Sequence, residues 1–353
     1  MTKQEELEKE LKELDKLIDM GSIYNDFFGK TVSNAKKAKE AADFKPDIPG
    51  MMPLQSGKAQ KTDAPQEAQS EPQPAEEEDP RTLEELQAEL DSLIGLQTVK
   101  EDVKSLLNFI KVNQLRKERD MKTPTVSYHL VFTGNPGTGK TTVARLLGRM
   151  YYRMGLLPKG QLIEADRSTL VAGYMGQTAI KTQEVIQRAM GGVLFIDEAY
   201  SLAEDEKDSF GREAIETILK AMEDHRDELV VIVAGYTDLM HKFIDSNPGL
   251  ESRFNKYFEF PDYTGEELYG IYELQCRKNG YKLTEDAAAA LKTKLCEIYE
   301  VREPDFGNAR DVRNMFEKAI GRQANRLALL ESVTDEDLET LNLDDIAIWE
   351  DFA

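Results

Sequence analysis

The chain of 353 residues is poor in the residue types that build covalent or metal-bound frameworks. Its two cysteines, Cys276 and Cys296, fall in a stretch that reads as helical, which indicates a reducing compartment and no disulfide framework. The three histidines, His129, His225 and His241, are scattered without the spacing of zinc ligands. These absences exclude a disulfide-rich secreted domain and a structural zinc site.

Long apolar runs and an excess of positive charge are also missing. No stretch approaches the roughly eighteen apolar residues of a membrane span, and the N-terminus has no signal-peptide core. The net charge of −21 opposes non-specific binding to nucleic acid or to anionic membranes, because such binding needs clustered Lys and Arg. We therefore expect a cytoplasmic protein with no nucleic-acid partner and no membrane insertion.

The chain does contain a complete phosphate loop, Gly-x-x-x-x-Gly-Lys-Thr, at residues 134–141. A strand-like run precedes it and a helix-like run follows it, as this motif requires. Glycines let consecutive backbone N–H groups face phosphate oxygens, while Lys140 would lie near the β- and γ-phosphates and Thr141 would reach Mg²⁺. The residues expected to hold ATP here are Asn135, Pro136, Gly137, Thr138, Gly139, Lys140, Thr141 and Thr142.

A second motif follows about fifty residues later, where the apolar run 193–196 ends in Asp197 and Glu198. Such a run suits a buried parallel strand whose carboxyl end reaches the site. Asp197 would hold Mg²⁺ directly or through water, and Glu198 would act as general base on the attacking water. A strand followed by an acidic helix cap has the same pattern, but the spacing from the phosphate loop favours hydrolysis of a nucleoside triphosphate.

Composition separates an N-terminal region from the main body. Residues 1–44 predict a small helical module, in which Leu7, Leu11, Leu14 and Ile18 form a stripe of two heptads. The stripe fits a docking or self-association helix, or an amphipathic helix packed on its own chain. Residues 45–80 contain seven of the thirteen prolines and predict a disordered linker.

The body alternates strand-like and helix-like segments, which predicts an α/β fold with a parallel sheet over residues 81–262. After Pro261 we expect no further strands. A C-terminal α-helical lid is predicted at 263–331, and an acidic tail with one or two short helices at 332–353. The expected strands are 128–133, 161–165, 193–197, 229–234 and 257–260, and the expected lid helices are 264–279, 284–300 and 308–331.

Three further segments carry candidate functional residues. Tyr174 and Met175 lie between two glycines, either as an exposed loop that grips an apolar partner or as a buried turn. Arg253 precedes the last strand and is either a surface ion-pair residue or an arginine finger for a neighbouring subunit. Arg310 falls in the first turn of a helix that Asn308 can cap, where the helix dipole disfavours a cation, so it is a candidate for function.

Over residues 83–330 these motifs together resemble the AAA ATPases, specifically the CbxX/CfqX family. That family includes red-type rubisco activases, the stage V sporulation protein K group and ATPases of type VII secretion. The segments that carry the resemblance are Leu93–Leu96 with Val99 and Lys100, Gly134–Thr141, Gly173–Ala179, Met190–Tyr200 and Gly307–Asn314.

The resemblance implies an AAA P-loop fold and a homo-oligomeric ring, usually a hexamer, with ATP and Mg²⁺ bound between subunits. It assigns Ile94 and Gly95 to the adenine pocket, and Tyr174, with Met175 beside it, to a central pore loop. It assigns Arg253 to the arginine finger in trans and Arg310 to sensor 2.

One position departs from the family pattern. AAA proteins usually carry Asn as sensor 1 at the end of the fourth strand, but here Tyr236 occupies that place. A hydroxyl of Tyr236 or Thr237 is the candidate replacement for orienting the water.

The leading function is therefore an ATP-hydrolysing ring that remodels or threads a protein client through an aromatic pore loop. The alternative is an ATP-controlled scaffold or switch that recruits partners through its N-terminal helix. The Asp197–Glu198 pair and Arg253 favour turnover. The acidic charge and Tyr174 argue against a nucleic-acid motor, and the helical lid argues against a small-molecule kinase. No single client follows, because the N-terminal region and the tail do not resemble the compact rubisco activase.

Overall fold

The computed structural model describes residues 79–124, 126–174, 176–204 and 208–347. The chain divides into two compact units, 1–80 and 81–353, and the second contains almost all of the described residues. The predicted N-terminal module at 1–44, nearly all of the predicted linker, and Met175 lie outside the described residues.

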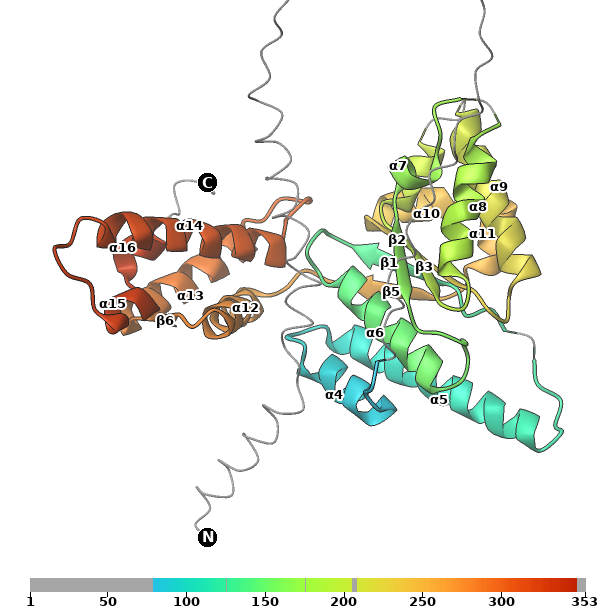
Figure 1. Ribbon diagram of the computed structural model, residues 1–353, viewed down its shortest axis with the longest axis horizontal. Coiled ribbons are helices and arrows are strands. Elements are labelled where there is room, and N and C mark those ends of the chain that lie inside the picture. The colour runs from blue at the N-terminus through green and yellow to red at the C-terminus, as the bar shows by residue number, and fades with distance from the viewer. Residues whose placement is uncertain (1–78, 125, 175, 205–207, 348–353) are drawn as a thin grey trace, which may run out of the picture. The chain divides into compact units, whose positions relative to one another are not determined.

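The centre of the second unit is a five-stranded, wholly parallel sheet with strand order β2-β3-β4-β1-β5 (Figure 1). Strands β1, β3 and β4 are buried along their whole length, which explains their continuous apolar sequences. The predicted α/β class with a parallel sheet is confirmed. The strands are β1 (Leu130–Gly134), β2 (Leu162–Ala165), β3 (Val193–Ile196), β4 (Val230–Gly235) and β5 (Tyr257–Phe260).

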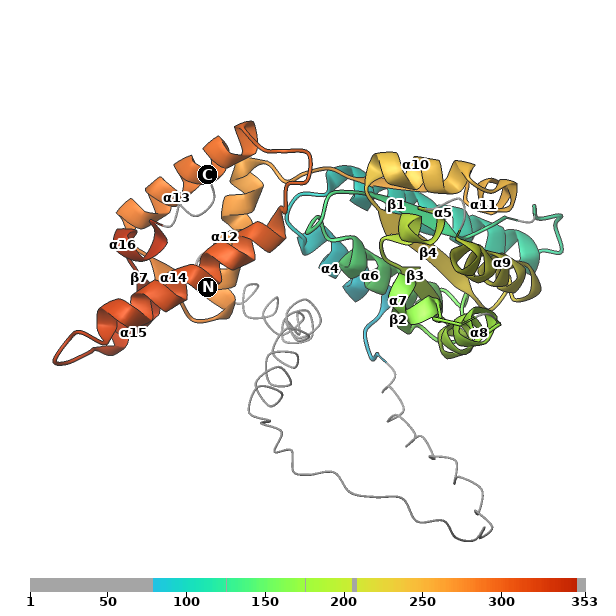
Figure 2. The ribbon, with the colours of Figure 1, turned by 90° about the horizontal axis from the view of Figure 1, so that it is seen from above.

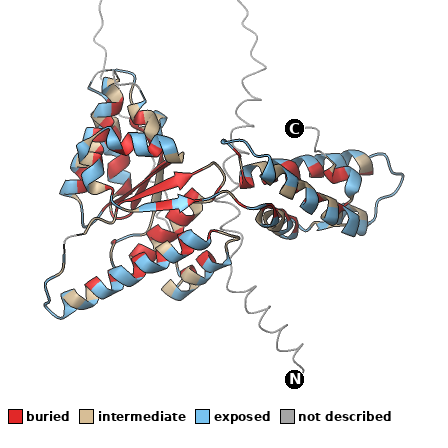
Figure 3. Cartoon of the chain, turned by 180° about the vertical axis from the view of Figure 1, so that it is seen from behind, coloured by how far each residue is buried: buried red, intermediate tan, exposed pale blue. Residues whose placement is uncertain are grey.

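Helices cover both faces of this sheet (Figures 1 and 2). Alternate side chains of each strand point to opposite faces. Phe132 and Phe195 pack with α4, α5 and α6, whereas Val131 and Leu194 pack with α8, α9 and α10. Strands β1, β3 and β4 are therefore coloured as buried in Figure 3. The helices are α4 (Leu83–Ser92), α5 (Gln97–Glu118), α6 (Lys140–Arg153), α7 (Arg167–Leu170), α8 (Thr178–Ala189), α9 (Ser209–Asp224), α10 (Thr237–Asp245) and α11 (Pro248–Arg253), with a 3-10 turn η1 (Ala199–Ala203).

The residues after β5 form the predicted helical lid, with helices α12 (Gly265–Lys278), α13 (Glu285–Glu300) and α14 (Ala309–Leu327). The expectation of no strands after Pro261 is wrong, because β6 (Lys282–Leu283) pairs in parallel with β7 (Thr340–Leu341). These two-residue strands are too short to produce a sequence pattern. Two short helices, α15 (Asp335–Glu339) and α16 (Leu343–Ile346), complete the described part of the lid.

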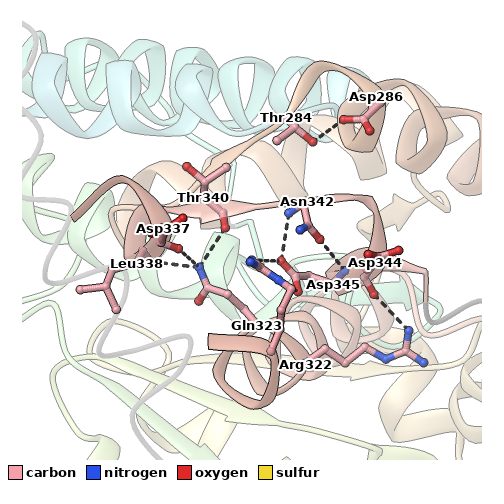
Figure 4. Close-up of polar contacts among 11 residues, drawn as sticks. Thr284, Asp286, Arg322, Gln323, Asp337, Leu338, Thr340, Asn342, Asp344 and Asp345 are labelled. Atoms are coloured by element: carbon pink, nitrogen blue, oxygen red, sulfur yellow. Dashed lines mark hydrogen bonds and ion pairs between the residues drawn. The ribbon is translucent and has the colours of Figure 1, made fainter. Parts of the chain in front are cut away.

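The acidic segment after residue 331, expected as a tail with one or two short helices, contains α15 and α16 and packs on the lid. Gln323 of α14 donates to three backbone carbonyls of this segment, those of Asp337, Leu338 and Thr340, at 2.9–3.0 Å (Figure 4). Arg326 binds both carboxylate oxygens of the buried Asp345, at 2.9 and 2.7 Å. At least one of the carboxylates that make this segment acidic therefore holds it on the lid through an ion pair.

Among the described helices, none combines the length and the apolar character that crossing a bilayer requires.

Candidate active site

The phosphate loop follows β1 in the predicted strand–loop–helix order, and α6 begins at Lys140. Gly134, Gly137 and Gly139 all have positive φ angles, of 141°, 71° and 95°. A Cβ added at Gly134 would collide with the carbonyl oxygen of Phe260, and one at Gly137 with that of Gly307. At Gly134 and Gly137 glycine is therefore required for two reasons, the positive φ angle and the close approach of a neighbouring backbone carbonyl.

The other residues of the phosphate loop lie around these three glycines. Thr138 is fully buried, and its hydroxyl donates to the carbonyl of Asn135 at 2.8 Å, which closes the loop on itself. Asn135, Pro136, Thr141 and Thr142 are half-buried, so they are held by the fold while part of each faces solvent.

Lys140 is the centre of the charged groups of the site. Its ammonium is buried and donates to the carbonyls of Gly134 and Asn135, both at 2.8 Å. Burial lowers the pKa of Lys140 to about 8, with Arg310 lowering it further and with Asp197, Asp262 and Glu198 opposing the shift. The fold thus brings the predicted residues of the phosphate loop, the second motif and the lid within electrostatic reach of one another. Phosphate oxygens would stabilise the charged form of this lysine.

Asp197 and Glu198 lie at the carboxyl end of β3, as predicted. Desolvation raises the pKa of the Asp197 carboxyl, and the charge of Lys140 opposes that shift. Glu198 is exposed and has the left-handed conformation, with φ 49° and ψ 43°. Its backbone N–H donates to Asp197 Oδ1 at 3.1 Å. A non-glycine residue in this conformation is strained, and such strain is frequent at functional sites.

The end of β4 lies between these two motifs. Thr133 of β1 pairs with Gly235, and Ile196 of β3 pairs with Val233, so Tyr236 follows the strand that separates the phosphate loop from Asp197. The resemblance places the sensor 1 Asn of AAA proteins at this position. Thr237 is half-buried as the first residue of α10.

Tyr200, which the sequence reasoning did not single out, lies beside the candidate site. Its ring lies against Gly235, where an added Cβ would be 2.7 Å from a ring carbon, and its centroid is 6.1 Å from that of Tyr236. Desolvation, followed by the charge of Glu198, raises the pKa of Tyr200 to about 12, so it remains a hydroxyl donor at neutral pH. The sequence feature that could have pointed to Tyr200 was its position two residues after Glu198.

Ile94 and Gly95 lie in the break between α4 and α5, where Gly95 and Leu96 are consecutive left-handed residues with φ of 63° and 57°. This turn lies beside the phosphate loop, because a Cβ added at Gly139 would be 3.5 Å from the Leu96 side chain. Tyr263, which the sequence reasoning also missed, is buried against Gly95 and donates its hydroxyl to the carbonyl of Thr138 at 3.2 Å. The signal was its position three residues after the end of β5.

Arg310 is exposed in the first turn of α14, as predicted. The expectation that Asn308 caps this helix is wrong. Its side chain makes no capping bond and instead bonds Asp262, the N–H of Tyr263 and the carbonyl of Phe306. The local sequence pattern predicted a cap, but the side chain of Asn308 bonds residues outside the helix instead.

Arg253 does not join the other residues within the same chain. It ends α11, seven residues before Phe260, which pairs with Gly134 of the phosphate loop. Its carbonyl accepts from the hydroxyl of Ser127, which precedes β1, so Arg253 lies at the amino end of the strand whose carboxyl end carries the phosphate loop. Its guanidinium lies 3.3 Å from a carboxylate oxygen of Glu223, and its buried Nε has no hydrogen-bond partner among the described residues.

Tyr174 lies in the loop between α7 and α8, and 74% of its surface is exposed. A Cβ added at Gly173 or Gly176 would meet nothing within 4 Å, so the loop stands clear of its surroundings. Ile180, at the start of α8, is also exposed. These observations contradict the buried-turn interpretation of Tyr174.

The donors at the site fit Mg²⁺ that is shared with a nucleotide. Thr141 and Asp197 provide hard oxygen atoms, the type of ligand that Mg²⁺ prefers, and phosphate oxygens and water commonly complete its shell. In the described part of the chain, no group of three or more His, Cys, Asp and Glu side chains could hold a metal alone.

Comparisons with known proteins agree with this geometry. The family model "ATPase family associated with various cellular activities (AAA)" matches residues 130–262, and the AAA lid domain model matches residues 264–353. Stage V sporulation protein K of Bacillus subtilis is 43% identical over 270 residues, covering 76% of this chain and 84% of that protein. Protein CbbX of Cereibacter sphaeroides is 46% identical over 246 residues, covering 69% and 78%.

A third relative is the chloroplastic ribulose bisphosphate carboxylase/oxygenase activase of Cyanidioschyzon merolae. It is 44% identical over 268 residues, covering 75% of this chain and 91% of that protein. Among solved structures, a mutant of RuvB from Thermotoga maritima aligns with 73% of this chain and 69% of its own, at 18% identity and a TM-score of 0.48.

The chain belongs to the AAA ATPases, and within them to the CbxX/CfqX family. The predicted family and the predicted ATPase activity are confirmed by this membership.

Proposed function

We propose that this ATPase assembles into a homo-oligomeric ring, a hexamer by analogy with its family, and remodels or threads a protein client through the loop that carries Tyr174. The observation that carries the proposal is the exposure of that aromatic side chain, 74%, on a loop with no close neighbours at its glycines. An exposed aromatic ring can hold an extended chain by apolar contact. The name of one relative, rubisco activase, gives a protein as its target.

We assign each residue of the site a separate role in ATP hydrolysis. Bound ATP and Mg²⁺ supply the transferable phosphoryl group and the counter-charge. Thr141 and Asp197 would hold the ion, Lys140 would bind the β- and γ-phosphates, and Glu198 would accept the proton of the attacking water. The adenine would lie beside Ile94 and Gly95.

The position of Arg253 supports a shared site between subunits. It lies at the amino end of β1, whereas its own phosphate loop follows the carboxyl end, so it cannot serve that loop as an arginine finger. A head-to-tail contact, in which it leaves the exposed Glu223 for the γ-phosphate of a neighbour, would place it correctly. Head-to-tail contacts form closed rings when their rotation closes. Arg310 would reach the same phosphate from the lid of the subunit that binds the nucleotide.

We place this activity in the cytoplasm, without a nucleic-acid partner. The two free cysteines fit a reducing compartment, and the net charge of −21 opposes binding to polyanions.

The chemistry is tested by two variants. Lys140→Ala should lose ATP binding, because the phosphates lose their main cationic partner. Glu198→Gln should bind ATP but hydrolyse it at least ~10²-fold more slowly, the usual scale for removing a general base. Glu216→Gln, the same change at an exposed position of α9, is the control. Near-normal turnover in Glu198→Gln would contradict the assigned role.

The ring and its pore loop are tested by cross-linking. A Tyr174→Cys chain, with Cys276 and Cys296 replaced by Ala, should give ATP-dependent covalent dimers when treated with a short bismaleimide, because each subunit offers one thiol to a reagent with two reactive ends. Leu329→Cys, 87% exposed on the lid, is the matched control and should not. Assembly and ATP turnover without cross-linking at position 174 would instead support the scaffold function.

A further inference from the structure

The linker between β5 and the lid carries a carboxylate, Asp262, that joins the phosphate loop to the lid. Its Oδ1 accepts two side-chain amide hydrogen bonds, from Asn135 Nδ2 at 2.9 Å and from Asn308 Nδ2 at 2.8 Å. Its Oδ2 accepts from Arg302 Nε at 3.1 Å. One oxygen thus connects the phosphate loop to the residue directly before α14.

Asn308 is held at this junction at a conformational cost. It is fully buried and has φ 51° and ψ −127°, a combination that strains any residue except glycine. Its amide oxygen accepts from the N–H of Tyr263 at 2.9 Å, and its amide nitrogen serves Asp262 and the carbonyl of Phe306. Glycine would satisfy the backbone, so the side-chain contacts are the physical reason for asparagine here.

Asn135 connects Asp262 to Lys140, the lysine proposed to bind phosphate. Its carbonyl accepts from Lys140 Nζ at 2.8 Å, while its side chain donates to Asp262. A continuous set of hydrogen bonds therefore runs from Lys140 through Asn135 and Asp262 to Asn308. Arg310 is two residues further along the chain.

Arg302 fixes the direction of the carboxylate. Its guanidinium stacks on the ring of Tyr299, 3.9 Å from the centroid, and donates to the carbonyl of that residue at 2.6 Å. Anchored in this way, it occupies Oδ2 of Asp262 and leaves Oδ1 for the two asparagines.

We propose that Asp262 is a positioning residue that relays the binding of nucleotide phosphates in the loop 134–141 to the start of lid helix α14. The relay rests on the proposed ATP chemistry. When phosphate oxygens draw the Lys140 ammonium, the Asn135 carbonyl loses a donor and the loop adjusts. The Asn135–Asp262–Asn308 bonds carry that adjustment to the helix that bears Arg310. A merely structural role for Asp262 predicts lower stability and no loss of the nucleotide response.

The first test is Asp262→Asn, which keeps the shape of the side chain but cannot accept from all three donors at once. ATP affinity should stay within about threefold, and turnover should fall about tenfold, the scale of one hydrogen bond to a charged group. ATP should alter amide hydrogen exchange at residues 309–313 in the parent chain, and this response should be lost in the variant. Glu339→Gln, which removes another lid ion pair, is the control and should behave as the parent.

The second test is a double-mutant cycle between Asn135→Ala and Asn308→Gly, since coupling needs direct evidence. Asn308→Gly breaks the relay at its other end and relieves the backbone strain, which offsets part of the cost of the lost side-chain bonds. The two effects on turnover should be non-additive, because each breaks the same relay. Additive effects, or an unchanged exchange response in Asp262→Asn, would overturn the relay while ATP hydrolysis by the parent stands. A parent chain that binds no ATP would overturn the proposed function and the relay together.

Discussion

At the scale of single residues, the candidate site is where the backbone conformation is most strained. Four described non-glycine residues have positive φ angles: Leu96, Asp120, Glu198 and Asn308. Three of them border the candidate site, at Leu96 between α4 and α5, at Glu198 and at Asn308 before α14, whereas Asp120 lies outside it. Strain of this kind persists only where tertiary contacts over-determine the conformation.

His129, directly before β1, is a buried residue with a different role. Its Nδ1 accepts a hydrogen bond from the N–H of Val231 at 3.0 Å, which assigns the neutral ring with its proton on Nε2. Burial, with smaller contributions from Arg253 and Lys256, lowers the pKa of His129 to about 4. This histidine therefore joins β1 to β4 only while it is neutral.

This assignment predicts how stability depends on pH. The folded pKa, about 4, lies below the ordinary value near 6.5, so the unfolded chain binds the proton first. The stabilisation is complete above about pH 6.5 and falls as pH decreases towards 4, with about 1 kcal/mol lost between pH 7 and 5.5. Urea unfolding at these two pH values should show a larger loss for the parent than for His129→Asn, whose amide oxygen can accept the same bond. Equal losses would contradict the assignment.

At the scale of elements, the loop between α7 and α8 differs from the rest of the α/β subdomain. The helices around it bury their apolar faces against the sheet, but the loop presents Tyr174 to solvent. By contrast, Tyr151 of α6 is fully buried. Tyr174 is thus accessible to a partner, whereas Tyr151 of the same subdomain is part of the core.

Alanine substitution should separate these two classes. Tyr174→Ala should leave thermal stability almost unchanged and basal ATP turnover within a few-fold, while client-stimulated turnover disappears. Tyr151→Ala should destabilise the protein by about 3–5 kcal/mol, because it removes a buried aromatic side chain. Thermal melting and turnover are measured on the same samples. A large fall in melting temperature for Tyr174→Ala would place its ring in the core and remove the main support for threading.

At the scale of the whole molecule, the residues proposed to act in hydrolysis lie at two opposite ends of the sheet. The phosphate loop, Asp197 and Glu198 lie at the carboxyl ends of the strands. Arg253 lies at the opposite end, where β5 begins. Since all five strands are parallel, the two groups of residues cannot meet within one chain, but they can meet between neighbours.

Mixing inactive subunits tests this division. Arg253→Ala should bind ATP and turn it over slowly, and Lys140→Ala should not bind ATP. A mixture should partly regain turnover, because a Lys140→Ala subunit still supplies its finger to the intact phosphate loop of an Arg253→Ala neighbour. A mixture of Lys140→Ala with Glu198→Gln is the control and should regain nothing, since both lack a residue of the same group. If mixed assemblies of the first pair, verified by mass, stay inactive at every ratio, the shared site is wrong.

The sequence alone determined the fold class, the family and the positions of the nucleotide motifs. These features are local, because a phosphate loop needs its glycines, its lysine and its threonine within eight consecutive residues, 134–141. Buried parallel strands likewise show themselves as short apolar runs, so the five strands were expected at nearly the residues where they occur.

Only the tertiary structure decided how these local features combine. Asn135 and Asp262 are 127 residues apart in sequence, and no periodicity relates them. Asn308 follows the pattern of a helix cap, but its side chain bonds the linker instead, because buried polar partners outweigh a local capping bond. The exposure of Tyr174 and the packing of the acidic segment on the lid were decided in the same way. Each depends on which distant surfaces the fold brings together, and composition holds no information about that.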